Sequence, residues 1–140
     1  MSNFRGYYVK AYNDTILDQY LAVEGFKCTP DQRQDKDSYR DGYGILHRNV
    51  LPGVTTTLEL TTIDGLNIDQ VIAFKEAINS GLLNSMERKV TLTYWNDERM
   101  AYCTDTFYMP DMTFTHSRIQ GGTSIYKAAT FKFIGYGETR

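Results

Sequence analysis

The chain has 140 residues, of which 41% are hydrophobic and 23% are charged. This length is typical of one domain, and the composition is that of a chain that folds rather than one that stays disordered. Its 15 basic and 17 acidic residues give a formal net charge of -2, so no excess positive charge is present to neutralise a nucleic-acid backbone. We expect a single folded domain, residues 1–140, without sequence-specific binding to nucleic acid.

The sequence contains no apolar run of the length that a signal peptide or a membrane-spanning helix requires. We therefore expect a soluble protein that is made in a cytosol and does not bind a membrane. The two cysteines, Cys28 and Cys103, lie far apart in the sequence. In a cytosolic protein this arrangement favours small buried hydrophobic residues over a disulfide.

Strands are expected to dominate the structure, because the chain is rich in threonine and has 11 tyrosines, and both residue types favour the half-buried surface of a sheet. Residues 6–12 form the first predicted strand, and residues 16–26 are predicted to form short strands around a turn. The segment from about 29 to 43 is strongly polar and has no apolar stripe of either period. It is predicted to be an extended solvated loop or a long hairpin arm.

The middle of the chain continues with strands. Residues 45–50 are a predicted strand, and Leu51-Pro52-Gly53 is typical of a turn. The next segment, residues 55–62, alternates apolar and polar side chains, with Leu58 and Leu60 on one face. This alternation predicts a strand with one buried and one solvated face.

One α-helix is predicted at about residues 68–80. Asn67 can cap its first turn, and Gln70 is placed to complete a capping box. The apolar residues that recur at near-helical spacing, and so predict one buried face, are Val71, Ile72, Phe74 and Ile78. Gly81 is predicted to end the helix in a left-handed conformation.

Four more strands are predicted after the helix. Residues 89–95 and 100–109 form a hairpin with a polar tip, and residues 113–119 and 124–134 follow on either side of a Gly-Gly turn. Connections this short join antiparallel strands. The predicted fold is therefore mainly β (α+β): an antiparallel β-sandwich or barrel with one flanking helix.

No group of residues predicts catalysis, a cofactor or a bound metal. His47 and His116, together with the two cysteines, would be enough ligands for zinc, but no two of the four are close in sequence as zinc ligands usually are. Residues 35–42 resemble a calcium loop only in being acidic, because the central glycine and the final glutamate are missing. We expect a protein that is not an enzyme.

The polar segment is the candidate for a contact between subunits. It mixes basic, acidic and aromatic side chains, which suit a polar interface. The candidate interface residues are Arg33, Lys36, Asp37, Tyr39, Arg40 and Tyr43. The alternative interpretation is a solvated loop of mixed charge with no partner.

The order of several short motifs spans nearly the whole chain. In chain order they are Gly-Tyr-Tyr-Val-Lys (6–10), Asp-Ser-Tyr-Arg-Asp (37–41), Gly-Ile-Leu-His-Arg (44–48), Thr-Thr-Thr-Leu-Glu-Leu (55–60), the helix near 71–78, and Lys-Ala-Ala-Thr-Phe-Lys-Phe (127–133). This order resembles a family of small structural proteins from the tails of siphophages and prophages of Gram-positive bacteria. It is also similar to tail-tube proteins, distal tail proteins and baseplate hub domains, which pack two antiparallel sheets with a flanking helix and an early long loop or hairpin.

The resemblance implies an assembly role. Subunits of those proteins form rings, commonly hexamers, around a channel through which DNA passes. For this chain it implies a virion tail component, assembled in the host bacterial cytoplasm, with copies of itself and other tail proteins as partners. Distal tail proteins usually carry a second domain, so the chain would correspond to the ring-forming part alone or to an adaptor. The alternative function is a tail-tip module that binds a carbohydrate or a receptor through exposed tyrosines and Trp95.

Overall fold

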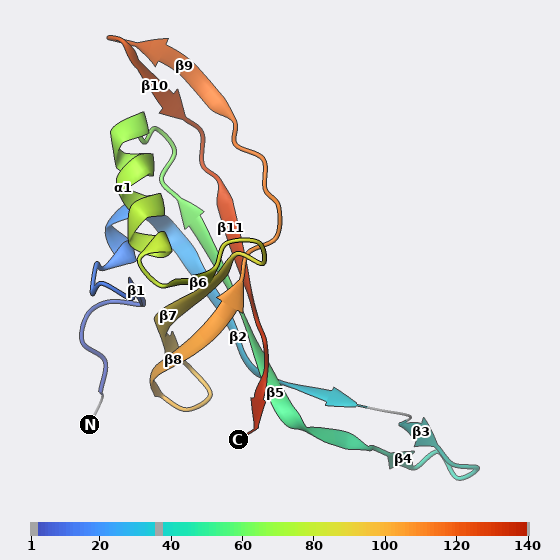
Figure 1. The fold of residues 1–140 in the computed structure, drawn as a ribbon. Helices are drawn as coiled ribbons and strands as arrows, with labels where there is room; N and C mark the ends of the chain where they lie inside the picture. The colour runs from blue at the N-terminus through green and yellow to red at the C-terminus, as the bar shows by residue number, and fades with distance from the viewer. Residues whose placement is uncertain (1–2, 36–37, 140) are drawn as a thin grey trace.

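A computed structural model describes residues 3–35 and 38–139 (Figure 1). The elements, in chain order, are β1 (Val9–Ala11), the 3-10 helix η1 (Leu17–Tyr20), β2 (Leu21–Asp35), β3 (Tyr39–Arg40), β4 (Leu46–His47), β5 (Val50–Thr62), α1 (Ile68–Asn79), β6 (Leu82–Asn84), β7 (Lys89–Asn96), β8 (Ala101–Tyr108), β9 (His116–Gln120), β10 (Thr123–Tyr126), β11 (Thr130–Gly135) and β12 (Glu138–Thr139). All strand pairs within the described ranges are antiparallel. The predicted fold class, mainly β with one helix, is confirmed.

Eight strands form one curved sheet. Its main order is β1-β7-β8-β11-β5-β12, with β2 paired to the other side of β5 and β6 paired to β7. The two outer strands β1 and β2 do not pair with each other, so the sheet is not a closed barrel. The two edges nevertheless come close, since Tyr8, the residue before β1, stacks its ring on Phe26 of β2 with centroids 5.2 Å apart. The sheet is therefore curled, and a seam remains between β1 and β2.

Asp18 of η1 holds the chain against the outer side of β1. Its carboxylate accepts hydrogen bonds from the backbone amides of Tyr8 (2.8 Å) and Val9 (3.0 Å). The prediction of short strands over residues 16–26 is wrong in its first part, where η1 stands instead. A side chain that bonds to nearby backbone amides competes with strand pairing, and Asp18 does so here.

The core lies between the curled sheet and α1. The buried large residues of the sheet include Leu58 and Leu60 of β5, as their alternation predicted. Phe131 of β11 is 2% exposed and packs edge-on against Phe74 of α1, with ring centroids 5.0 Å apart. Phe107 of β8 is fully buried on the same inner face. One helix thus completes the core of a sheet that does not close on itself.

The start of α1 is as the sequence predicts. Asn67 accepts a hydrogen bond from the amide of Gln70 (2.9 Å), and the Gln70 side chain accepts one from the amide of Asn67 (3.0 Å). The predicted buried face is wrong at Ile72, which is 47% exposed. Ile72 follows Val71 by one residue, which turns it about 100° away around the helix.

Gly81 has a different role from the predicted left-handed helix end. It is absent from the residues with positive φ, and Ser80 before it is still helical. A Cβ atom at Gly81 would lie only 2.7 Å from the carbonyl oxygen of Thr91 in β7. Glycine is required here because the chain passes close to a neighbouring strand.

The turn predicted at Leu51-Pro52-Gly53 is wrong, because β5 runs through it. Arg33 pairs with Val54 and Asp35 pairs with Val50, so β5 advances four positions while β2 advances two. This irregularity is a bulge in β5. A bulge is one of the few places where a strand accepts proline, which has no amide hydrogen to donate.

The predicted strand 124–134 is divided into β10 and β11. β10 leaves the large sheet and pairs with β9 as a separate hairpin. The chain is held at the break by hydrogen bonds from the Tyr126 amide to the Leu66 carbonyl (2.8 Å) and from the Lys127 amide to the Thr115 carbonyl (2.9 Å). Figure 1 shows this hairpin at one end of an elongated molecule and the extension of β2 and β5 at the other.

Candidate functional site

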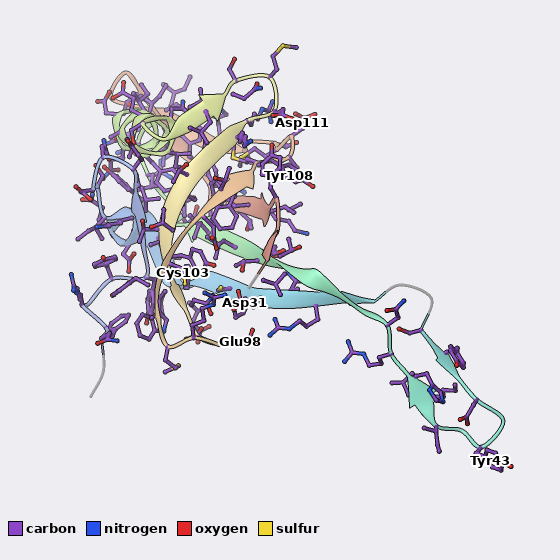
Figure 2. All side chains as sticks on the ribbon, turned by 60° about the horizontal axis from the view of Figure 1, so that its bottom comes forward. Asp31, Tyr43, Glu98, Cys103, Tyr108 and Asp111 are labelled. Carbon is purple, nitrogen blue, oxygen red and sulfur yellow. The ribbon has the colours of Figure 1, made fainter. Side chains whose placement is uncertain are left out.

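The polar segment of the sequence forms a hairpin arm that projects from the body (Figures 1 and 2). β2 and β5 remain paired as far as Asp35 and Val50, and β3 and β4 pair with each other nearer the tip. We call residues 38–49 the arm tip. Of the two predicted forms, a solvated loop or a long hairpin arm, the structure has the arm.

Asp41 organises the turn at the arm tip. Its carboxylate accepts hydrogen bonds from the amides of Tyr43 (2.9 Å) and Ile45 (3.1 Å), and its second oxygen lies 2.9 Å from His47 Nε2. The bond to His47, followed by the two amide bonds, lowers the pKa of Asp41. Gly44, with φ of 82°, supplies the left-handed residue of this turn.

The arm tip exposes apolar side chains. Tyr43 is 93% exposed, Tyr39 60%, Ile45 58% and Leu46 45%. Tyr39 and Leu46 lie on the two-stranded ladder of β3 and β4, and Tyr43 and Ile45 lie in the turn that connects them. Such a ladder is marginally stable in water on its own. Gathered apolar side chains on a surface are typical of sites where another molecule binds. The arm tip therefore has the composition of a contact surface.

A buried polar group fixes the base of the arm to the body. Asp31 is 5% exposed and has a φ of 45°, at a bulge of β2. Its carboxylate accepts hydrogen bonds from Arg99 Nε (2.9 Å) and Asn96 Nδ2 (3.3 Å), which belong to the β7–β8 hairpin. Its amide donates to Thr56 Oγ1 of β5 (3.1 Å). The base of the arm is thereby attached to β7 and to the turn between β7 and β8, and its two strands are joined to each other.

The cluster of polar side chains around Asp31 extends inward to Tyr94 and Asp105. The Tyr94 hydroxyl donates to the Asp105 carboxylate and accepts from Asn96 Nδ2 (3.4 Å). Burial, followed by the bond to Asp105, raises the pKa of Tyr94, so its hydroxyl remains a donor at neutral pH. Buried groups that are satisfied in this way hold one geometry, because every other arrangement leaves a polar atom without a partner.

The predicted interface residues divide between the two ends of the arm. Arg33 lies at the base, where its guanidinium donates to the Asp31 carbonyl and to Glu98 (3.0 Å). Figure 2 shows Asp31 and Glu98 at this base and Tyr43 at the far end. At the tip, Arg40 donates to the Gly44 carbonyl (2.9 Å). Tyr39, also at the tip, stacks on His47 with centroids 4.9 Å apart. Lys36 and Asp37 lie outside the described residues.

Sequence reasoning placed Asp31 only within the polar segment, without a role of its own, and missed Asn96, Ile45 and Leu46 as parts of this site. The sequence places Asn96 in a hairpin turn, and nothing in the sequence shows that this turn meets the base of the arm. Ile45 and Leu46 had a visible signal, since they are apolar residues next to the most polar stretch of the chain. That signal was interpreted as an ordinary strand.

The histidines and cysteines do not come together. His47 lies on the arm and His116 on β9, at opposite ends of the molecule, while Cys28 and Cys103 are free thiols packed against the core. Burial raises the pKa of Cys28 to about 12. Among the residues that the structure describes, no three His, Cys, Asp or Glu side chains are grouped to hold a metal ion. In the same residues, no helix has the length and apolarity to cross a membrane.

The fold and the arm define a mainly β protein with one helix and a projecting hairpin. The chain belongs to DUF6711, a family of unknown function, which matches residues 1–136. Neither a curated protein nor a solved structure matches the chain.

Proposed function

We propose that the protein is a non-enzymatic structural subunit of a bacteriophage or prophage-derived tail. In this proposal it forms or joins a ring in the tail tube, the distal tail or the baseplate region. Its partners are copies of itself, as in the hexameric rings of similar tail proteins, and other tail proteins. DNA only passes through the channel of the ring, and the subunit assembles in the host cytoplasm without a membrane.

The arm is the observation that carries this proposal. A two-stranded ladder with Tyr43 and Ile45 facing solvent gains little stability by itself, yet the chain holds it in a fixed direction through the buried Asp31. A rigid base and an apolar tip are the features of an element that reaches a neighbour. They agree with the early long hairpin of the tail proteins that the sequence resembles.

The geometry also allows a ring. The arm tip and the surface that would receive it are different parts of the molecule, so contacts between copies can repeat head to tail. Head-to-tail contacts generate a closed ring or an open filament. A symmetric dimer would instead require each arm to enter the receiving surface of the other copy at the same time.

Replacement of the arm tests the proposal. Asp35 and Val50 are cross-strand partners, so residues 36–49 can be replaced by Asn-Gly, which favours a two-residue hairpin turn. The variant removes none of the core, and we expect its thermal midpoint to change by less than about 3 °C. We expect it to lose assembly into rings, measured by light scattering and electron microscopy, and incorporation into tails. Rings formed by the armless protein would contradict the proposal.

A finer variant keeps the length of the arm. Tyr43→Ser combined with Ile45→Ser leaves the hairpin in place but removes the apolar surface, and we expect it to assemble poorly as well. The matched control is Ile119→Ser on β9, a side chain that is 83% exposed at the opposite end of the molecule. We expect this control to assemble like the unmodified chain.

A carbohydrate- or receptor-binding module of a tail tip is the second candidate. It was predicted from exposed tyrosines and Trp95, but Trp95 is 7% exposed and its indole donates to Asp97 (2.8 Å). Its ring is not available to stack on a sugar. Tyr12, 68% exposed, and Tyr43 are the most exposed tyrosines among the described residues. Titration with a panel of glycans, followed by chemical shifts of these two tyrosines, tests this candidate.

A further inference from the structure

The seam between β1 and β2 contains a groove of about 580 Å³. One wall is aromatic, formed by Tyr8, Phe26 and Trp95. The other is the wide bulge at the start of β2, where residues 22–25 stand out between the pairs Leu21–Thr62 and Phe26–Leu60. Val23 lies on this bulge and is 95% exposed. A groove of this volume is large enough to receive several side chains of another molecule.

The groove is acidic. Its described lining contains Asp18, Glu24 and Asp97 and no basic side chain. Asp18 and Asp97 are hydrogen-bonded to neutral donors, backbone amides and an indole, which leave their negative charge in place. A partner for this groove should therefore combine apolar side chains with positive charge.

The arm tip of this chain has that combination. Residues 38–49 contain two arginines, Arg40 and Arg48, and one acidic residue, Asp41, so the arm tip has a net positive charge. Tyr43 and Ile45 provide the apolar part. The arm of the same molecule points away from its body, as Figure 2 shows, so a tip that enters the groove comes from another copy.

We propose that the seam groove of one copy receives the arm tip of the next copy. This inference rests on the proposed ring-forming function and names the two surfaces that make the contact. The aromatic wall covers the apolar residues of the tip, and the carboxylates of the groove attract its arginines. The contact also fills the gap between β1 and β2, which do not pair with each other.

A second groove provides the comparison. It lies beside α1, has a volume of about 320 Å³, and is lined by apolar residues such as Met112 and Phe114 together with Lys75 and Arg88. Its described lining has no acidic side chain. A basic tip is disfavoured there, so charge directs the arm to the seam.

Disulfide trapping between two copies tests the proposal. One preparation carries Tyr43→Cys on the arm, and a second, with a tag of different size, carries Val23→Cys on the seam. The control replaces Val23→Cys by Met86→Cys, which is equally exposed at 95% and lies near the second groove. After mild oxidation of equal mixtures, we expect the mixed disulfide to Val23→Cys to form about tenfold faster than that to Met86→Cys.

Charge reversal supplies an independent readout. Glu24→Lys on the seam copy should slow the mixed disulfide by about fivefold, and Arg40→Glu on the arm copy should restore it. Glu76→Lys, which makes the same charge change on the exposed side of α1, should have no effect. Glu24→Lys without effect would overturn the charge argument and with it the choice of groove.

Trapping at Val23→Cys no faster than at Met86→Cys overturns the seam proposal. Light scattering of the unmodified chain, measured in parallel, separates this failure from that of the proposed function. If rings form but no disulfide is trapped at the seam, the assembly role holds, and the arm tip binds a different surface of the next copy. A chain that neither assembles nor traps overturns both.

Discussion

β2 and β5 run through both the body and the arm, and the two halves of this strand pair differ in what surrounds them. In the body, residues 57–61 of β5 lie between β2 and β11, and Leu58 and Leu60 are fully buried. Beyond Val54 the pair continues toward the arm, and at the tip the hairpin pairs only with itself. In both halves strand pairing sets the direction of the chain. Stability comes from the apolar surface that the strands bury, and only the body half buries such surface.

The boundary between the halves is polar. Where the leucines of β5 end, Thr56 bonds to the amide of Asp31, and the carboxylate of Asp31 reaches the β7–β8 hairpin. Hydrogen bonds are directional, whereas apolar packing tolerates small rotations. A polar joint is therefore suited to fix the angle of an arm that has no core of its own.

The largest expected effect is on the body. Phe131→Ala removes a ring that is 2% exposed and packs against Phe74 and Phe114, at 5.0 Å and 5.8 Å between centroids. We expect the free energy of unfolding to fall by about 3–5 kcal/mol, measured by urea denaturation. Lys132→Ala, the exposed neighbour in the same strand, should change it by less than about 0.5 kcal/mol.

Tyr43→Ala makes the same kind of truncation on the arm. Because this ring contacts mostly solvent, we expect the free energy of unfolding of the isolated protein to change by less than about 0.5 kcal/mol. Assembly of the variant into rings of subunits should be weaker than that of the unmodified chain. A loss of stability equal to that of Phe131→Ala would show that the arm shares the core of the body and would break the comparison.

The joint is expected to give an intermediate effect. Asp31→Asn removes the charge that accepts from Arg99 and keeps a residue type that tolerates the left-handed φ of 45°. We expect the free energy of unfolding, measured by urea denaturation, to fall by about 1–2 kcal/mol. Asp31→Ala should cost more, since alanine also strains that backbone conformation. Equal losses for the two variants would show that backbone strain is not part of the effect.

The parts of the fold that could be predicted are those fixed by neighbours in sequence. The capping box at Asn67 and Gln70 and the alternation around Leu58 use contacts within a few residues. Pro52 and Gly81 were misinterpreted for the opposite reason. Their roles depend on β2 and on Thr91, which are distant in sequence, and a turn or helix end is the local interpretation of the same residues.

The candidate site divides in the same way. Its polar and aromatic composition is local, so Tyr39, Arg40 and Tyr43 could be chosen before the fold was known. The direction of the arm depends on Asp31 meeting Asn96 and Arg99, and this meeting requires the β7–β8 hairpin to lie beside β2. The seam groove is also invisible in the sequence, because it exists only where the two ends of the sheet approach each other.

The helix cap gives a smaller effect within the body. Asn67→Ala removes the side-chain acceptor for the Gln70 amide, and we expect a loss of about 1 kcal/mol in urea. Asp69→Ala, in the first turn but outside the capping box, is the control and should cost less. Assembly should be unchanged in both, since neither residue belongs to the arm or the seam.

The smallest effect is at the arm tip and depends on pH. The pKa of Asp41 is lowered from 3.8 in the folded arm, so the order that its carboxylate provides is fully present above that value and is lost as the pH falls through the lower, folded pKa. We expect the amide chemical shifts of Tyr43 and Ile45 to titrate with a midpoint below 3.8, measured by NMR. Asp41→Asn keeps an acceptor oxygen but cannot ionise, and this titration should disappear. The amides of Leu58 and Leu60, which lie in the body ladder, should not follow the same midpoint. A midpoint at or above 3.8 would mean that the bond between His47 and Asp41 does not order the tip in solution, and the arm would then have to be shaped by its partner.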